Sequence, residues 1–422
     1  MMSSTTKFKA SFLSILLICF FSIGCGGGGN SSSESNNNSD EQNRNNSCRS
    51  ERLIEIKNQE QLDAMRNCRN GNYILLNDIA LDENKAGFAA NGSGWNPIGD
   101  VVRTDVNSYT LYPFTGTLNG NGHKITNLWI DRADSNFIGL FSNICGVVIS
   151  NLSVEITNGK QINGNRSVGG IAGEINCDST TITDTHVIGN ISGESWVGGI
   201  AGSMTDTVIT NSRFEGDVNG FDSVGGIAGR LLVSNITNSY AAGNINGTQE
   251  IGGIAGIVSH SIVTNSYFVG DVNGYSFVGG IAGNAHGSNV TNNYAAGNVS
   301  GDNFVGGIAG TAFSVEGSTM VLINNAAINS YVTGNYYTSY INRIIGEGTA
   351  VISNNFALED MNGNFDTSNL TYYGINKTAN QLKQESTYSD AVVDGGLGWR
   401  FGNNVSAPWK ISNGYPYLYW QD

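Results

Sequence analysis

Val197-Gly-Gly-Ile-Ala-Gly202 decides the fold, because this hexapeptide recurs along the chain at a nearly constant spacing. Its other copies begin at Val168, Val224, Ile251, Val278 and Val305, with isoleucine replacing the first valine in one of them. The first step between copies is 29 residues, and each of the next four is 27 residues. A second motif keeps this period at Asn211-Ser212, Asn238-Ser239, Asn265-Ser266 and Asn292-Asn293. Such close self-similarity indicates a stack of identical supersecondary units.

The repeat unit has no helical periodicity, and its short apolar stretches are broken by glycine and asparagine. A unit of this length can form one coil of three short strands, each pairing in parallel with its copy about 4.8 Å above. We therefore predict an all-β, right-handed parallel β-helix of about 27 residues per coil over residues 114–356. Residues 51–113 and 357–422 are not repetitive and are expected to cap the open strand edges at its two ends.

The glycine pair inside the motif is interpreted as a corner of the coil. Val197 and Ile200 are three residues apart, so a straight strand would place them on opposite faces. Both can point inward if Gly198-Gly199 forms a bend, which glycine permits. A phosphate-binding loop is the alternative, but no helix or lysine follows the pair and it recurs six times.

The amino-acid composition supports an all-β chain and limits the classes of molecule that it could bind. The sequence contains 57 Gly but only 4 Pro, and its 13% of charged residues is too low for many solvent-facing helices. The formal net charge of −14 argues against nucleic acid as a partner, because phosphates would be repelled. We predict no cofactor and no metal, since the chain has four histidines and no Cys-x-x-Cys.

One repeated polar position alternates between amide and carboxylate. It is occupied by Asn190, Asp217, Asn244, Asp271 and Asn298. The alternation places the carboxylates two coils apart, roughly 10 Å, which lowers repulsion along the stack. A calcium ladder is the alternative reading, but calcium sites usually need more converging carboxylates.

The N-terminus is predicted to be a targeting segment. Lys7 and Lys9 precede an apolar run from residue 12 to 23, which is too short for a permanent membrane span. Residues 1–24 therefore form a signal peptide, and Ser22-Ile-Gly-Cys25 resembles the lipobox of bacterial lipoproteins, which implies acylation of Cys25. Ordinary cleavage is the alternative. Residues 25–50 have almost no apolar side chains and are predicted to be a disordered tether.

An exported chain meets an oxidising compartment, so its remaining cysteines are expected to pair. We predict disulfides between Cys48 and Cys68 and between Cys145 and Cys177. The segment beginning at Phe137 is a degenerate first copy of the hexapeptide. Cys145 and Cys177 follow the first and second copies by 8 and 9 residues, which places them on adjacent coils.

The array resembles the GLUG repeat of bacterial surface proteins, and the flanking segments strengthen the resemblance. The leading flank contributes Tyr73-Ile-Leu-Leu-Asn-Asp-Ile79, Trp95-Asn-Pro-Ile-Gly99 and Pro113-Phe-Thr-Gly-Thr-Leu-Asn-Gly-Asn-Gly-His123; a variant last copy is Ile341-Asn-Arg-Ile-Ile-Gly346; the trailing flank contributes Gln381-Leu-Lys-Gln384, Trp399, Trp409-Lys-Ile411 and Tyr415-Pro-Tyr-Leu418. The resemblance implies a β-helical fold and says little about activity. Similar arrays precede the protease domain of immunoglobulin A peptidases, but this chain has no His-Glu-x-x-His.

Three further local features are predicted. Residues 60–68 form one short helix. Tyr240, Tyr267 and Tyr294 recur every 27 residues and are expected to stack. The C-terminal aromatic residues are expected to seal the last coil, with a ligand-binding cage as the alternative: Trp399, Phe401, Trp409, Tyr415, Tyr417 and Trp420.

Aromatic residues also mark a candidate binding surface beside the hexapeptide. The residue before each first position reads Trp196, Ser223, Glu250, Phe277 and Phe304, and two residues earlier the chain reads Glu194, Phe221, Thr248, Tyr275 and Asp302. By alternation these side chains face outward or lie on a corner. The candidate ligand-stacking residues are Trp196, Phe221, Tyr275, Phe277 and Phe304, suited to sugar rings. The alternative is that the rings fold over the corner and cover backbone.

These features lead to three functional hypotheses. The first is a monomeric, lipid-anchored adhesin or interaction module at the bacterial outer membrane or cell surface, which binds a polysaccharide or a host or neighbour surface protein. The second is a polysaccharide-active β-helix enzyme, and the third is a stalk without a ligand. We predict no catalytic residues, because Asp217 and Asp271 read as stacking residues and the four histidines have no repeated carboxylate partner.

Overall fold

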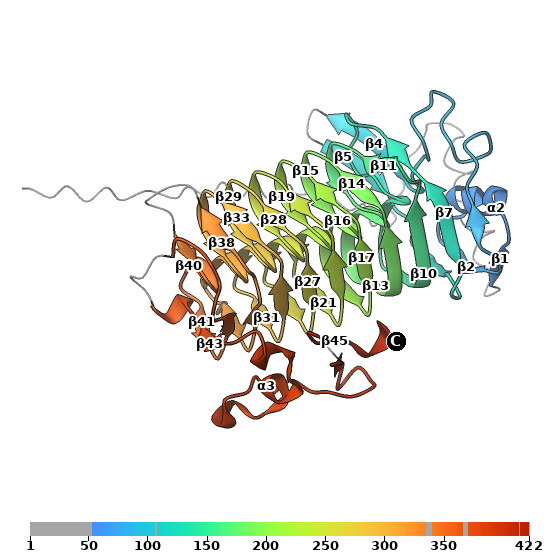
Figure 1. Ribbon diagram of the computed structural model, residues 1–422. Helices are drawn as coiled ribbons and strands as arrows, with labels where there is room; N and C mark the ends of the chain where they lie inside the picture. The colour runs from blue at the N-terminus through green and yellow to red at the C-terminus, as the bar shows by residue number, and fades with distance from the viewer. Residues whose placement is uncertain (1–52, 106–107, 335–339, 366–369, 413, 422) are drawn as a thin grey trace, which may run out of the picture.

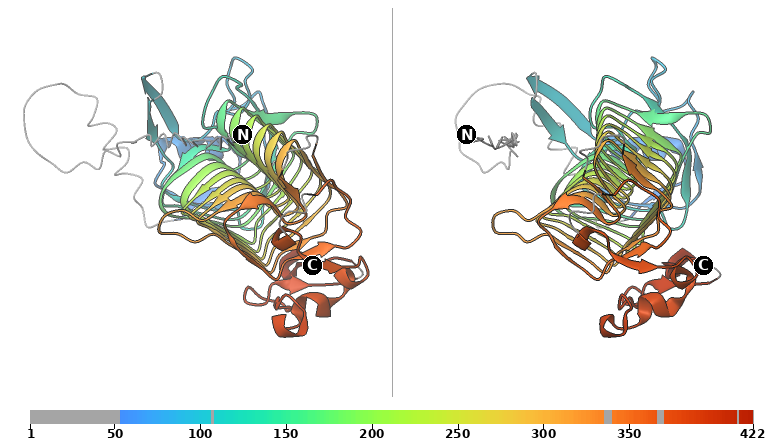
Figure 2. Two further views of the ribbon diagram at one scale, coloured as in Figure 1. Left: turned by 90° about the vertical axis from the view of Figure 1, so that its left-hand side faces the viewer. Right: turned by 60° about the vertical axis from the view of Figure 1, so that its left-hand side comes forward.

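The computed structural model describes residues 53–105, 108–334, 340–365, 370–412 and 414–421. They form a parallel β-solenoid of about nine turns of roughly 27 residues, which confirms the predicted fold (Figure 1). Figure 2 shows the turns stacked in register behind one another. The predicted signal peptide, the tether, Cys25 and Cys48 lie outside the described residues.

Each regular coil contains five short strand segments rather than the predicted three, and residues with positive φ, such as Val233, Asn238 and Gly243, separate the first four segments of one coil. In one coil they are β20 (Ala228–Leu232), β21 (Asn235–Thr237), β22 (Tyr240–Ala242), β23 (Ile245–Asn246) and β24 (Gln249–Gly252). Every segment pairs in parallel with the segment 27 residues further along the chain.

Two of the resulting stacks are separate sheets. The eight-stranded sheet contains β8 (Ile130–Asp131), β11 (Gln161–Asn163), β14 (Asn190–Ser192), β18 (Val218–Asn219), β23, β28 (Val272–Asn273), β33 (Val299–Gly301) and β38 (Val332–Gly334). The seven-stranded sheet carries the start of the hexapeptide and contains β12 (Arg166–Val168), β15 (Ser195–Gly198), β19 (Asp222–Gly225), β24, β29 (Ser276–Gly279), β34 (Asn303–Gly306) and β39 (Ile341–Asn342).

The remaining stacks belong to one 26-stranded sheet that bends around the coil. Its first stack is β9 (Phe141–Ile144), β13 (Ala172–Ile188), β16 (Ala201–Thr210), β20, β25 (Ala255–Ser259), β30 (Ala282–His286), β35 (Ala309–Phe313) and β40 (Ile345–Gly348). Its second is β1 (Ile54–Ile56), β2 (Asn72–Leu75), β6 (Thr117–Asn119), β10 (Val148–Ile156), β21, β26 (Ile262–Thr264), β31 (Asn289–Thr291), β36 (Val321–Ile323) and β41 (Val351–Ser353). Its third is β3 (Ile79–Ala80), β7 (Lys124–Leu128), β17 (Arg213–Glu215), β22, β27 (Tyr267–Val269), β32 (Tyr294–Ala296), β37 (Ala326–Ala327), β42 (Phe356–Leu358) and β43 (Ile375–Lys377).

The hexapeptide forms the predicted corner. Val197 and Ile200 are both fully buried, and the backbone bends at Gly199 and Ile200 between β15 and β16. Neither glycine of the pair has a positive φ; they are required because the coils approach so closely. A Cβ on Gly198 would meet the backbone of Ala228 in the next coil, and one on Gly199 would overlap the Phe214 ring.

A ladder of buried polar side chains runs along the corner between the second and third stacks of the 26-stranded sheet. The backbone N–H of Ser212 donates to Oγ of Ser239 at 3.2 Å, and the N–H of Ser239 donates to Oγ of Ser266 at 3.2 Å. Each hydroxyl also donates to the carbonyl oxygen two residues earlier, as Ser239 does to Thr237 at 2.9 Å. The backbone N–H and the side-chain hydroxyl of Ser212 and Ser239 are therefore both hydrogen-bonded although these serines are buried.

Replacing Ser239 by alanine should lower the free energy of unfolding by about 1–3 kcal/mol, because the buried N–H of Ser212 loses its acceptor. Urea unfolding followed by circular dichroism measures the change. Ser406→Ala, at an exposed serine of the C-terminal segment, is the matched control and should be nearly neutral. Equal losses in both variants would show that the ladder adds nothing to stability.

The alternating amide and carboxylate position has a local explanation. The N–H of Asp217 donates to Oδ1 of Asn190 at 3.0 Å, and the N–H of Asn244 donates to Oδ1 of Asp217 at 2.8 Å. Asp271 accepts from the N–H of Asn298 in the same way, at 2.8 Å. Either side chain supplies the oxygen that this turn needs, so the carboxylates are used as backbone acceptors.

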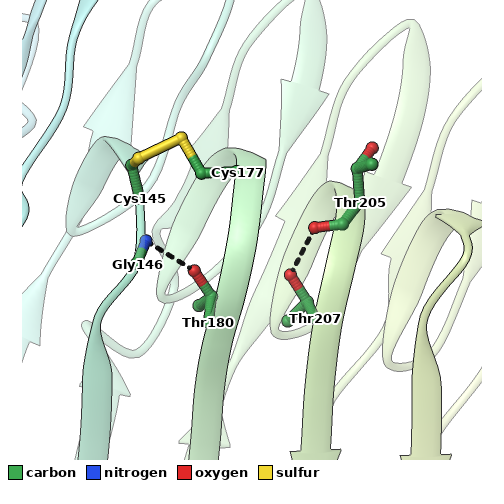
Figure 3. The surroundings of a disulfide bond; sticks show 6 residues. All are labelled: Cys145, Gly146, Cys177, Thr180, Thr205 and Thr207. Carbon is green, nitrogen blue, oxygen red and sulfur yellow. Dashed lines mark hydrogen bonds between the residues drawn. A yellow bond between two sulfur atoms is a disulfide. The ribbon is translucent and has the colours of Figure 1, made fainter.

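The predicted disulfide between Cys145 and Cys177 is present and joins the ends of adjacent coils (Figure 3). Beside it, the N–H of Gly146 donates to Oγ1 of Thr180 at 3.0 Å. The degenerate first copy is shifted by one residue from the prediction, since Ile138 rather than Phe137 pairs with Val168. Cys68 is also disulfide-bonded, and its predicted partner lies outside the described residues.

The N-terminal residues continue the stack and carry a projecting hairpin. The predicted helix is present as α2 (Gln59–Asp63) followed by a 3-10 turn, η1 (Ala64–Asn67), and Asn58 caps it by accepting from the N–H of Gln61. Strands β4 (Asp100–Asp105) and β5 (Ser108–Tyr112) form an antiparallel hairpin that stands away from the coils (Figure 2).

The C-terminal segment lies along the side of the solenoid, so the prediction that its aromatic residues seal the last coil is wrong (Figures 1 and 2). The last coil is instead extended by β43, which pairs with β42. The short turn η2 (Leu370–Tyr372) precedes β43. After β43 the described residues form short elements: η3 (Gln381–Lys383), α3 (Glu385–Ser389), η4 (Val392–Asp394), β44 (Trp409–Lys410), β45 (Tyr417–Leu418) and η5 (Tyr419–Gln421).

This segment packs on the predicted tyrosine stack, which is present. The rings of Tyr240, Tyr267 and Tyr294 lie parallel with centroids 4.8 Å apart. The Trp420 ring stacks on Tyr240 at 5.7 Å, and the hydroxyl of Tyr294 donates to the carbonyl of Pro416 at 2.8 Å. The C-terminal aromatic residues therefore pack against the tyrosine rings on the flank of the solenoid.

Candidate functional site

The candidate site is the corner that precedes each hexapeptide, where one residue per coil is left-handed. Ser167, Trp196, Ser223, Glu250, Phe277 and Phe304 have φ between 54° and 59°. This conformation costs a non-glycine residue about 1–2 kcal/mol, and it turns the chain so that the following valine points inward. In this left-handed column the aromatic and acidic side chains of Trp196, Glu250, Phe277 and Phe304 are half-buried, whereas Ser167 and Ser223 are buried.

Trp196 does not offer a free face. The Arg166 guanidinium lies 3.6 Å from its ring centroid, and the Arg230 guanidinium of another coil lies 4.9 Å away. Such contacts hold a cation over the electron-rich face of an indole. The ring is half-buried, and a sugar that stacked on it would have to compete with these two guanidinium groups.

Phe277 and Phe304 form a second group with Tyr340. Their ring centroids are 5.1 Å and 5.2 Å apart along the column, with interplanar angles of 9° and 7°. Because each ring covers the face of the next, Phe277 and Phe304 are half-buried. The rings of this group therefore pack on one another along the corner.

Phe221 and Tyr275 are the exposed members of the predicted set. Their side chains are 55% and 47% exposed. They occupy the same position of alternate coils, with Thr248 between them, in a column of hydrogen-bonded residues that also contains Asn165, Glu194 and Asp302. The structure thus divides the five candidates into an arginine-bound ring, a self-stacked pair and two rings open to solvent.

A buried carboxylic acid lies beneath this corner, and the sequence reading missed it. Glu174 accepts from Oγ of Ser167 at 2.9 Å and from Oγ of Ser203 at 3.4 Å. Burial raises the pKa of Glu174 to about 7, although the charges of Arg230 and Arg166 oppose the rise. Its position is filled by Ser203, Arg230 and Ile257 in the following coils, so no repeat pattern marks it.

Two histidines have carboxylate neighbours. Nδ1 of His123 lies 3.1 Å from Asp78, near the surface, and Nε2 of His186 lies 3.5 Å from Glu215. Burial lowers the pKa of His186 to about 4, so the ring is neutral at physiological pH. Glu215 also accepts from the hydroxyl of Tyr240 at 2.6 Å, which ties this group to the tyrosine stack.

A cavity of about 710 Å³ lies between the projecting hairpin and the degenerate first copy of the hexapeptide. Arg103, Tyr109, Arg132, Asp134 and Phe137 contribute to its lining. Nε and Nη2 of Arg132 are buried without a hydrogen-bond partner, and burial lowers the pKa of this guanidinium. The hairpin is non-repetitive, so the sequence contains no periodic signal for this cavity.

Two searches of the described residues bear on metals and membranes. Within them, no three or more His, Cys, Asp or Glu side chains gather closely enough to hold a metal ion. The same ranges contain no helix with the length and apolar character needed to span a bilayer.

Comparison with known proteins gives partial similarities. No protein-family model matches the chain. Halomucin from Haloquadratum walsbyi is 32% identical over 157 residues, 36% of this chain and 2% of that protein. A "Putative Gly-rich membrane protein" from Evansella cellulosilytica is 38% identical over 91 residues, 21% of this chain and 9% of that protein. The chain thus spans only a small part of the length of these curated relatives.

One solved structure is also similar in outline. It is the crystal structure of a "putative immunoglobulin A1 protease" from Bacteroides ovatus. The superposition has a TM-score of 0.39 and 18% sequence identity, and it covers 88% of this chain and 93% of that one.

Proposed function

We propose that the protein is a GLUG-repeat interaction module of the bacterial cell surface that binds a polysaccharide along the flank of its solenoid. In this proposal it is exported, anchored to the outer membrane by a lipid on Cys25, and acts as a monomer without a cofactor or a catalytic role. One relative is described as a membrane protein, which supports a place at the cell envelope. The alternative partner for this flank is a surface protein of a host or of a neighbouring cell.

The observation that carries the proposal is the pair of solvent-exposed rings, Phe221 and Tyr275, on one column of the solenoid. Exposed aromatic rings offer flat apolar area with little conformational entropy to lose, which suits stacking on sugar rings. The rigid stack of coils holds both rings at a fixed separation, so a long ligand can contact them together.

Replacing Phe221 and Tyr275 together by alanine should weaken polysaccharide binding at least tenfold, equivalent to about 1.4 kcal/mol. The purified protein is tested against immobilised neutral and acidic polysaccharides and matrix proteins by biolayer interferometry. Tyr331→Ala is the matched control, because Tyr331 is 50% exposed but lies beside the eight-stranded sheet at β38. This control should bind like the unmodified chain.

The same panel separates the alternatives. Binding to a matrix protein alone would replace the polysaccharide by a protein partner. Absence of binding to every immobilised probe would count against the proposal and favour a stalk without a ligand. Cleavage of a polysaccharide during the assay, detected as the release of new reducing ends, would contradict the non-catalytic assignment.

A further inference from the structure

The column that holds the two exposed rings has a fixed spacing. The backbone N–H of Phe221 donates to the carbonyl of Glu194 at 2.8 Å, and this pattern continues through Thr248 and Tyr275 to Asp302 with distances of 2.8–2.9 Å. Each step is therefore one coil, about 4.8 Å along the solenoid axis. Phe221 and Tyr275 are two coils apart, which is roughly 10 Å.

We propose that this column binds a neutral, β-1,4-linked polysaccharide, with Phe221 and Tyr275 stacked on alternate sugars. The inference rests on the proposed function and names its ligand class. An extended β-1,4-linked chain is a flat ribbon in which each sugar is turned over relative to the last. Alternate sugars therefore present the same face, and the two-sugar repeat has nearly the length of two coils. Thr248 lies between the rings, where the intervening sugar would pass.

The charges around the column favour a neutral ligand. Glu194 and Asp302 occupy the two positions that bound the aromatic pair, and Glu194 accepts from Nδ2 of Asn165 at 3.0 Å. The whole chain carries a formal net charge of −14. A polyanionic glycan would bring like charges toward two carboxylates, whereas a neutral glycan would not.

Linkage is the first test, because it separates shape from sugar chemistry. The purified full chain is titrated calorimetrically with cellohexaose and maltohexaose, which contain the same sugar in β-1,4 and α-1,4 linkage, and with chitohexaose as a second β-1,4 probe. At least one β-1,4 probe should bind tenfold or more tightly than maltohexaose, because an α-1,4 chain curls and cannot lay alternate rings on both side chains. Equal affinity for all three, or tighter binding of maltohexaose, would overturn the inference.

Ring spacing is the second test. The exchange variant Thr248→Tyr with Tyr275→Thr keeps the composition but places both rings on adjacent coils, so their separation halves. β-1,4 binding should fall at least tenfold while the thermal unfolding midpoint stays within a few degrees. Unchanged affinity in the exchange variant would refute the two-coil match.

The two proposals fail in different ways. If Phe221→Ala with Tyr275→Ala abolishes binding to a polysaccharide but neither linkage nor ring spacing matters, the flank binds glycans and the β-1,4 inference is wrong. If the alanine pair leaves all binding intact, the proposed function of this flank fails as well.

Discussion

Gly253→Ala should destabilise the protein by about 3 kcal/mol, among the largest losses expected for a single added methyl group. A Cβ at this position would overlap the carbonyl oxygen of Gly280 in the next coil and the buried ring of Phe268. Neither neighbour can move alone, because Gly280 is held in the backbone ladder and Phe268 is only 1% exposed. The two coils would have to separate locally, which lengthens the hydrogen bonds between them.

Urea unfolding of the variant and of Gly414→Ala provides the comparison. Gly414 has an ordinary φ, and the nearest atom to an added Cβ is the Ser412 carbonyl oxygen at 3.9 Å, so this control should change stability little. A Gly253 variant as stable as the control would mean that the coils are not packed as closely as described.

The second large effect concerns Glu174 and pH. Burial raises its pKa from the ordinary 4.5 to about 7, so the folded protein binds this proton more tightly than the unfolded chain. The contribution of Glu174 to the free energy of unfolding is fully present below pH 4.5 and is lost as the pH rises through 7. The loss amounts to about 3 kcal/mol by pH 8. Arg166 and Arg230 are the neighbouring cations that limit the loss, and Ser167 and Ser203 donate to the carboxyl oxygens.

Glu174→Gln mimics the protonated acid and should remove this pH dependence. The free energy of unfolding of the variant should match that of the unmodified protein at pH 4 and exceed it by about 3 kcal/mol at pH 8. Subtracting the two pH profiles cancels the contributions of all other titrating groups. A constant difference between pH 4 and pH 8 would contradict a buried, protonated Glu174.

The repeat spacing was sufficient to predict the fold because parallel stacking makes each residue meet its own copy. Val197 lies opposite Val224, and Tyr240 lies opposite Tyr267, as the 27-residue period requires. The adjacent-coil position of Cys145 and Cys177 follows from the same logic, and it was predicted although the first hexapeptide is shifted by one residue.

The candidate site was harder to predict, because its details depend on departures from the repeat. The arginines around Trp196 come from two different motif positions, so only the folded corner brings Arg166 and Arg230 to one ring. The left-handed backbone at Trp196 has no local signature, since bulky residues seldom adopt positive φ. The place of the C-terminal segment depends on pairs such as Tyr294 and Pro416, which are 122 residues apart.

That segment changes how the coils depend on one another. A solenoid normally holds together through neighbouring units only, so it can fray one coil at a time from either end. Here Trp399 donates to the carbonyl of Asn324, Tyr294 to that of Pro416, and Trp420 to that of Asn238, so one brace ties the coil of Asn238 to the coils two and three further along. The brace is synthesised after the coils that it spans. During synthesis the coils can therefore unfold one at a time until this segment has been made. Once it is in place, we expect the coils that it contacts to unfold as one cooperative unit.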